Sequence, residues 1–297
     1  MVEIASGKLG LGLVPEVGGS IAYFRLNRNG ASVDLMRPLS EGDRGRRDPL
    51  GVAMFPMVPY ANRIAGNCFS FRGRSFEVKP NFPPDPLNVH GSGWLLPWTV
   101  ARVAADEAVL ELSRNGAAEP HQYVARQRFK LSPERLLVHI EVRNSGTTAM
   151  PFGFGQHPWF IRDPDVTVRF VAGAFWIEGT DGIPTEKIRT PPELGFTDPT
   201  HLPKARRNNC YGLWDGLIEI AWPSRRIGLR IEADPIFKHL MLYCDPARNA
   251  FCLEPQTNVV GAFNMVEEDL HGYDAGVIVL EPGAAAGGSI SFVPFDL

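Results

Sequence analysis

The stretch Gln127-Arg-Phe-Lys-Leu131, Ser132-Pro-Glu-Arg135 and Leu136-Leu-Val-His-Ile-Glu-Val142 decides the fold class of this chain. Polar and apolar residues alternate on both sides of the central tetrapeptide, a pattern typical of strands with one buried and one solvated face. The Ser-Pro pair between the two runs favours a turn. The stretch therefore predicts an antiparallel β-hairpin.

The same alternation recurs along the chain between closely spaced Gly and Pro residues. With 30 Gly and 26 Pro among 297 residues, most segments are interrupted before they reach the length of an ordinary helix. Further strands are expected at residues 21–26, 69–71, 75–78, 109–112, 166–170, 217–221, 227–231, 275–280 and 289–292. Residues 181–204 hold five prolines and are expected to form a loop, and Trp214-Asp-Gly216 a hairpin turn. The chain is predicted to be all-β, as one large antiparallel β-sandwich.

The overall composition and charge narrow the classes of partner. Hydrophobic residues make up 44% and charged residues 21%, and the formal net charge is −3. Because the charge forms neither a basic stripe nor an acidic tail, nucleic acid and membrane surfaces are not expected as partners. No apolar run could span a bilayer, and Met1-Val-Glu-Ile4 does not start a signal peptide, so we expect a cytoplasmic protein.

Four cysteines occur without a Cys-x-x-Cys pair, so neither a zinc motif nor a redox motif is indicated. They are Cys68, Cys210, Cys244 and Cys252. In a cytoplasmic protein we expect them to be reduced thiols that fill the core.

Chemistry is first suggested by Pro151-Phe-Gly-Phe-Gly-Gln-His-Pro-Trp-Phe160. Pro158 disfavours the helical region for His157, so we expect a strand that ends in a rigid turn and presents the imidazole beside an aromatic wall. Aromatic faces such as that of Trp159 suit the apolar C–H faces of a sugar ring, and an imidazole exchanges protons near neutral pH. The alternative is a structural histidine in an aromatic core.

Asn62 and Arg63 interrupt an apolar, proline-containing run, Met54-Phe-Pro-Met-Val-Pro-Tyr-Ala-Asn-Arg-Ile64. The planar guanidinium of arginine could bridge two vicinal hydroxyls or hold a ring oxygen. A structural arginine that bonds loop carbonyls is the competing interpretation.

His90 lies in the glycine-rich run Asn88-Val-His-Gly-Ser-Gly-Trp94. An imidazole and an indole beside a permissive backbone could form a platform for a sugar. Alternatively, His90 belongs to a loop and Trp94 to the core.

Glu254 ends an apolar run and precedes a proline in Phe251-Cys-Leu-Glu-Pro-Gln-Thr-Asn258. A carboxylate at a buried strand end is costly unless it is paired or functional. It is a candidate general base, or else an acceptor for loop N–H groups.

Taken together and in this order, these motifs resemble the aldose 1-epimerase (galactose mutarotase) family. The matching positions are Asn62-Arg63-Ile64, His90-Gly91, His157-Pro158-Trp159-Phe160 and Glu254-Pro255-Gln256. The likeness extends from about Gly10 to the C-terminus, and Asn208-Asn-Cys-Tyr211 also fits. It implies a galactose mutarotase-like supersandwich, here a single domain over residues 1–297.

The resemblance also implies an activity and roles for individual residues. It implies an isomerase that interconverts α and β anomers of a free aldose, as a monomer or homodimer, without metal or organic cofactor. Glu254 would be the general base at the C1 hydroxyl, and His157 the general acid at the ring oxygen, on opposite sides of the C1–O5 edge. His90 and Arg63, with Asn62, Trp159 and Asn208, would bind the sugar.

Asn208 departs from the family pattern, because many relatives have an aspartate there that binds sugar hydroxyls. Asparagine keeps a donor and an acceptor but lacks the charge. Two alternatives therefore stay open. The chain could be a non-catalytic carbohydrate-binding protein on the same scaffold, or an epimerase for a phosphorylated or acidic sugar. The second alternative needs cations near the cleft, for which Arg72 and Arg74 are the candidates.

Overall fold

A computed structural model describes residues 1–28, 30–116, 119–266 and 274–297. Its described strands are β1 Val2–Ser6, β2 Leu9–Val14, β3 Ser20–Arg28, β4 Ala31–Asp34, β5 Met54–Met57, β6 Cys68–Phe71, β7 Arg74–Glu77, β8 Thr99–Val103, β9 Glu107–Arg114, β10 Tyr123–Leu131, β11 Leu136–Asn144, β12 Met150–Phe152, β13 Gly155–Ile161, β14 Thr167–Glu178, β15 Pro184–Arg189, β16 Phe196–His201, β17 Arg207–Trp222, β18 Ile227–Ala233, β19 His239–Cys244, β20 Ala250–Gln256, β21 Ile278–Leu280 and β22 Ala285–Asp296. The helical turns are α1 Glu41–Arg46 and the 3₁₀ segments η1 Pro49–Gly51, η2 Ala65–Asn67, η3 Pro192–Leu194, η4 Pro223–Arg225 and η5 Ala262–Met265.

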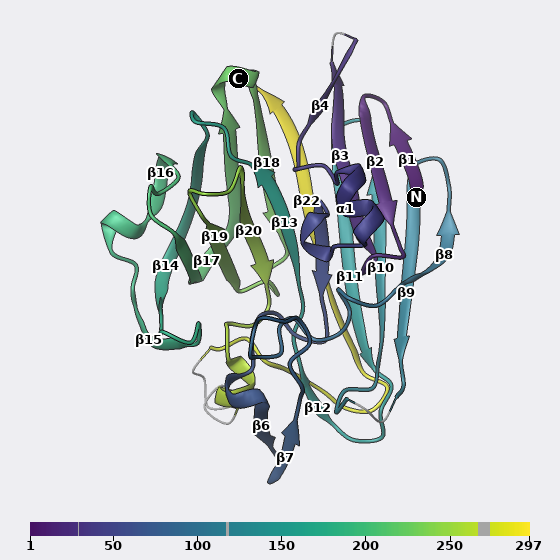
Figure 1. Cartoon of the computed structure of the whole chain (residues 1–297), viewed down its shortest axis with the longest axis vertical. Helices are drawn as coiled ribbons and strands as arrows, with labels where there is room; N and C mark the ends of the chain where they lie inside the picture. Colours follow the sequence, from purple (N-terminus) through teal and green to yellow (C-terminus); the bar gives the residue numbers. More distant parts are fainter. Residues whose placement is uncertain (29, 117–118, 267–273) are drawn as a thin grey trace.

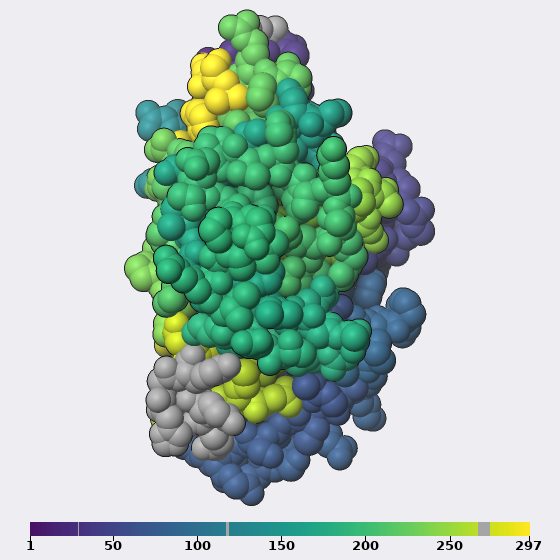
Figure 2. Space-filling model, turned by 90° about the vertical axis from the view of Figure 1, so that its left-hand side faces the viewer, coloured from purple at the N-terminus to yellow at the C-terminus, as the bar shows by residue number. Residues whose placement is uncertain are grey.

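The described strands confirm the all-β prediction. Eighteen of them form one continuous antiparallel sheet system, with two small two-stranded sheets beside it (Figure 1). Two strands connect its halves: β22 pairs with both β11 and β18, and β13 pairs with both β5 and β20. Figure 2 shows the molecule from the side of β14 and β17, where the teal and green strands cover most of the face. The architecture is the predicted large antiparallel sandwich.

The hairpin that opened the sequence analysis forms as expected. Strands β10 and β11 pair from Tyr123 opposite Asn144 to Leu131 opposite Leu136. Phe129 and Val138, which face one another across the two strands, are fully or almost fully buried in the main core. Alternating burial along both strands therefore fixes the register, because a shift by one residue would move every apolar side chain to the solvated face.

Three local expectations were wrong. Strand β13 runs through His157 and Pro158 to Ile161, so no turn follows the histidine. Residues 181–204 contain the strands β15 and β16. Trp214-Asp-Gly216 lies inside β17, where the pairing with β14 shifts register and Gly216 has a φ of 84°. In each place, pairing with a neighbouring strand extends structure across residues that would favour a turn in isolation. Where β14 pairs with β15, β16 and β17, the register shifts and the surplus residues form bulges.

Across the described ranges, we find no helix with the length and apolar character needed to cross a membrane.

Candidate active site

The site begins with a row of side chains on one face of the sheet. Across β17, β19, β20 and β13, the register places Asn208 opposite Tyr243, Tyr243 opposite Cys252, and Cys252 opposite Trp159. Residues opposite one another on neighbouring strands point to the same face. Four residues that are far apart in the sequence therefore lie side by side.

A second row runs parallel to the first, two residues away from it on each strand. Met241 lies opposite both Cys210 and Glu254, and His157 lies opposite Phe55 of β5. Because side chains two residues apart on a strand share a face, Glu254 and His157 stand next to each other. Their closest atoms, Glu254 Oε1 and His157 Nε2, are 3.1 Å apart.

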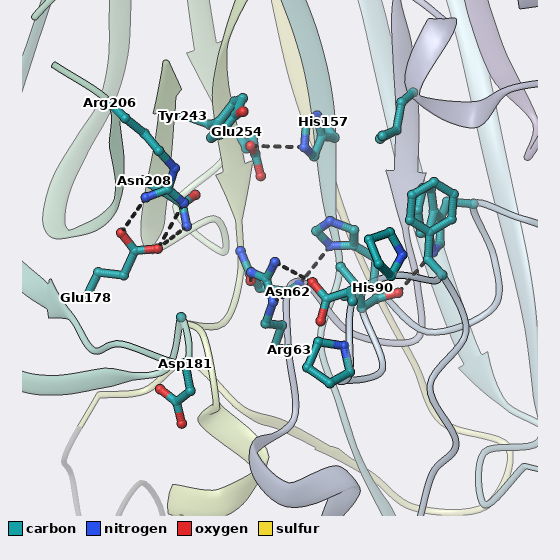
Figure 3. Close-up of a pocket in the computed structure, with 18 of the residues that line it drawn as sticks. Asn62, Arg63, His90, His157, Glu178, Asp181, Arg206, Asn208, Tyr243 and Glu254 are labelled. Carbon is teal, nitrogen blue, oxygen red and sulfur yellow. Dashed lines mark hydrogen bonds and ion pairs between the residues drawn. The ribbon is translucent and has the colours of Figure 1, made fainter. Parts of the chain in front are cut away.

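A pocket of about 860 Å³ opens over these two rows (Figure 3). All seven residues predicted for the site line it: Asn62, Arg63, His90, His157, Trp159, Asn208 and Glu254. It is also lined by residues that the sequence analysis did not anticipate: Asp85, Glu178, Asp181, Arg206, Tyr243 and Arg248. The structure thus brings the predicted residues together, whereas their individual roles stay predictions.

Glu254 and His157 form a pair that is almost withdrawn from solvent. Their side chains are 3% and 9% exposed, and Glu254 Oε2 and His157 Nδ1 hydrogen-bond to no other described residue. Burial lowers the pKa of His157 to about 3 and raises the pKa of Glu254 well above its usual value. Both shifts disfavour charge, so near neutral pH we infer that the two groups share one proton across the 3.1 Å contact.

Aromatic packing fixes the orientation of the His157 ring. Phe55 stacks on it at a centroid distance of 4.3 Å and an interplanar angle of 24°. The Trp159 ring lies next to the imidazole at a centroid distance of 5.2 Å. The guanidinium of Arg37 in turn covers the Trp159 ring, 4.5 Å from its centroid. The imidazole therefore meets Glu254 in a rigid apolar setting, which explains why burial dominates its pKa shift.

The motif residues Asn62 and His90 are joined by reciprocal bonds. Both have left-handed backbone conformations, with φ values of 64° and 57°. The Asn62 N–H donates to His90 Nδ1 at 2.8 Å, and the His90 N–H donates to the Asn62 carbonyl at 2.9 Å. Since Nδ1 accepts, the ring proton of neutral His90 lies on Nε2. Burial also lowers the pKa of His90 well below its ordinary value, so this group is a neutral donor.

Arg63 is held in place by a carboxylate that the sequence analysis missed. Its Nε and Nη2 donate to Asp85 Oδ2 at 3.0 and 2.6 Å, and Nη1 donates to Asn62 Oδ1 at 3.3 Å. Asp85 therefore orients the guanidinium and neutralises its charge, while the side chain of Arg63 stays 24% exposed in the pocket wall.

Asn208 sits in a second network, with Glu178 and Arg206 (Figure 3). Its Nδ2 donates to Glu178 Oε1 at 2.6 Å, and Arg206 donates to both oxygens of the same carboxylate at 3.1 and 3.2 Å. The sequence carries only a weak signal for Glu178, in the run Glu178-Gly-Thr-Asp-Gly182. No spacing rule connects that run with Asn208.

The arginines proposed to receive an acidic sugar lie elsewhere. Arg72 and Arg74 belong to the β6–β7 hairpin, and neither lines the pocket. Arg72 pairs with Glu281 at 3.0 Å on the exposed surface. The expectation that Arg72 and Arg74 supply cations near the cleft was therefore wrong.

Among the described residues, one group of three side chains could offer donors to a metal ion, and it includes the buried pair itself. His157, Cys252 and Glu254 each offer one ligand atom, and the three atoms lie within 4.8 Å of one another. Burial raises the pKa of the Cys252 thiol well above its ordinary value, and the neighbouring Glu254 adds to this shift. The thiol is therefore held in its protonated form, which is a poor ligand.

Comparison with known proteins places the chain in a family. The family model described as aldose 1-epimerase matches residues 1–292. The uncharacterized protein YphB of Escherichia coli K12 is 30% identical over 246 residues, covering 80% of this chain and 82% of YphB.

Solved structures with similar folds were also found. An Escherichia coli K12 protein assigned provisionally as an aldose 1-epimerase superposes with a TM-score of 0.89 at 28% identity, over 99% of this chain and 98% of that one. A GalM/aldose epimerase homologue from C. elegans gives 0.83 at 18% identity, over 100% and 98% of the two chains, and supports the fold alone. The chain therefore belongs to the aldose 1-epimerase family.

Proposed function

We propose that this protein interconverts the α and β anomers of a free aldose by general acid–base ring opening. The observation that carries the proposal is the contact between Glu254 and His157, two proton-exchanging groups 3.1 Å apart on the floor of a pocket of about 860 Å³. Membership of the family supports the same class of reaction.

The chemistry requires one proton to be removed and one to be delivered. With the shared proton on His157, Glu254 takes the proton of the C1 hydroxyl, the C1–O5 bond breaks as the aldehyde forms, and His157 gives its proton to O5. Rotation about the C1–C2 bond exposes the other face of the aldehyde, and the steps then run backwards. Protons and electrons balance, and no covalent intermediate with the protein is needed.

The geometry bears on how the two groups reach the sugar. Glu254 and His157 lie beside each other on one face of the sheet, with their closest atoms 3.1 Å apart. Since the hydroxyl oxygen and O5 are both bonded to C1, adjacent acid and base groups can reach both oxygens from one side. Neighbouring groups also let the shared proton move directly between them when the sugar has left.

Burial of the pair suits the ring-opened stage. After opening, Glu254 carries the proton and His157 is neutral, which is the protonation state that burial favours for both groups. The open-chain intermediate is therefore not penalised by a buried ion pair. General acid–base assistance of this kind contributes about 10²–10⁴-fold to a rate.

Other lining residues would hold the sugar in place. We assign the Nε2–H of His90 and the guanidinium of Arg63 to the ring oxygen and hydroxyls, because both are oriented donors. Trp159 offers an aromatic wall beside His157, and Asn62 and Asn208 offer amide groups at the two sides of the pocket.

Polarimetry tests the proposal. Fresh α-D-glucose, α-D-galactose and other α-aldoses are followed with wild-type protein and with Glu254→Gln. We expect the wild type to accelerate the change in rotation of at least one sugar, and the variant to lose that acceleration. Sugar binding seen by calorimetry without any acceleration would identify a carbohydrate-binding protein instead.

A further inference from the structure

We propose that Glu178 is the charged residue that reads sugar hydroxyls in this pocket, and that Asn208 serves as its partner and not as its substitute. This inference rests on the proposed function, because it assigns the recognition of the substrate to one side of the same pocket. The site it defines consists of Glu178, Asn208 and Arg206, and it would take two neighbouring hydroxyls of an uncharged sugar.

Strand pairing puts Glu178 into the pocket wall. The antiparallel strands β14 and β17 pair with Phe175 opposite Tyr211. This register brings Glu178, three residues after Phe175, opposite Asn208, three residues before Tyr211. The bond from Asn208 Nδ2 to Glu178 Oε1, at 2.6 Å, follows from this register. Both side chains line the pocket, and Glu178 is 21% exposed, so its carboxylate is accessible without being freely mobile.

The contact distance explains why residue 208 is an asparagine. At 2.6 Å, a carboxylate at residue 208 would face the carboxylate of Glu178 with no proton between them, and like charges this close repel strongly. The amide of Asn208 instead donates to Glu178 and leaves its own Oδ1 as an acceptor. The negative charge is present at this side of the pocket, but β14 supplies it.

Arg206 completes the arrangement and leaves an acceptor free. Its two terminal nitrogens donate to Glu178 Oε2 and Oε1 at 3.1 and 3.2 Å, while Asn208 occupies a second position on Oε1. A carboxylate has about four acceptor positions, so one on Oε2 is still open. This position and Asn208 Oδ1 form a pair of acceptors for two hydroxyl donors.

The charges around the pocket favour an uncharged sugar at this subsite. The arginines in the described lining are Arg63, Arg206 and Arg248, and the acidic residues are Asp85, Glu178, Asp181 and Glu254. Arg63 and Arg206 are each paired with a carboxylate, and Arg248 is exposed on the loop between β19 and β20. Arg206, the cation bonded to Glu178, is already paired with it, so a phosphate or carboxylate bound at this subsite would lie against the Glu178 carboxylate.

Moving the negative charge from residue 178 to residue 208 tests the proposal. Glu178→Gln, Asn208→Asp and the double variant are compared with the wild type by polarimetry, and by calorimetry with the sugar that the wild type binds best. We expect Glu178→Gln to raise KM and Kd about tenfold with kcat changed less than about twofold, because a charge-assisted hydrogen bond is replaced by a neutral one. The double variant, which restores one carboxylate and one amide in contact, should recover most of that loss.

Two results would overturn the proposal. Either an unchanged KM and Kd in Glu178→Gln, or a double variant that is no better than Glu178→Gln, would show that Glu178 has only a structural role. Wild-type binding of glucose 6-phosphate at least as tight as that of glucose would remove the assignment to an uncharged sugar. Arg72→Ala, which lies outside the pocket, serves as the control and should leave KM and Kd unchanged, with circular dichroism to verify folding of each protein.

The proposed function can fail separately. If the wild type binds sugars but accelerates no anomerisation, the catalytic proposal is lost, whereas weaker binding by Glu178→Gln and its recovery in the double variant would still support this subsite.

Discussion

The two glutamates that line the pocket, Glu254 and Glu178, face different surroundings. The Glu254 side chain is 3% exposed, has one polar contact among the described residues, and has its pKa raised by burial. The Glu178 side chain is 21% exposed and receives three hydrogen bonds from Asn208 and Arg206. One carboxyl group is left free to exchange a proton, whereas the other is held as a fixed acceptor.

This difference separates chemistry from recognition within one pocket. A general base must gain and lose a proton easily, so it benefits from few fixed partners and from a shifted pKa. A group that reads hydroxyls must keep one charge and one direction, so it benefits from a second layer of donors. The same side chain thus takes either role according to what surrounds it.

The largest effect is expected from Glu254→Gln. The amide keeps the shape but cannot take the C1 hydroxyl proton, so kcat should fall by about 10²–10⁴-fold with little change in KM. Polarimetry on the preferred aldose measures both constants. Glu178→Gln, the same chemical change at the other side of the pocket, is the control and should affect KM instead. Equal kcat values for Glu254→Gln and the wild type would refute the catalytic assignment.

Arg63→Lys should have the next largest effect. Lysine keeps the charge but loses the planar fork that Asp85 orients, so kcat/KM should fall about tenfold through the loss of a charge-assisted bond to the sugar. The comparison of initial rates over a range of sugar concentrations checks this. A variant with unchanged kcat/KM would make Arg63 a structural residue of the pocket wall.

The pH profile should be flat where an ordinary histidine would titrate. Because burial lowers the pKa of His157 to about 3, acidification adds a second proton to the pair only near that pH. We expect kcat/KM, corrected for the spontaneous reaction in the same buffer, to change less than about twofold between pH 6.5 and 4. The rate should then fall at lower pH, and on the alkaline side once the shared proton is lost. An acid limb near pH 6.5, the ordinary imidazole value, would show that His157 is not shielded as described.

The smallest effect is expected from Arg72→Ala. This residue lies on an exposed hairpin, pairs with Glu281, and does not line the pocket. Exposed ion pairs contribute little, so activity toward aldoses and the affinity for glucose 6-phosphate should both stay within about twofold of the wild type. A specific loss of glucose 6-phosphate binding would restore the epimerase for phosphorylated sugars as a candidate function.

Much of the fold and most of the candidate site residues were predictable from local features, whereas Asn208 entered only through the resemblance to the family. Alternation of polar and apolar residues is a property of neighbouring positions, so the β10–β11 hairpin and the all-β class could be inferred directly. Unusual residue types in unusual surroundings, such as His157 before a proline and Glu254 at the end of an apolar run, were also visible without a structure.

The sequence by itself thus determined the all-β class and the residues worth testing, but neither the extent of every strand nor which residues touch. Only the tertiary structure placed Glu178 against Asn208 and Asp85 against Arg63, brought Glu254 and His157 into contact on one face, and carried β13 past Pro158. The physical reason is that these features depend on the register between strands distant in sequence, and register is set by the whole set of buried side chains acting together. The pKa shifts of His157 and Glu254 depend on the strand register as well, because burial is a property of the assembled sheet.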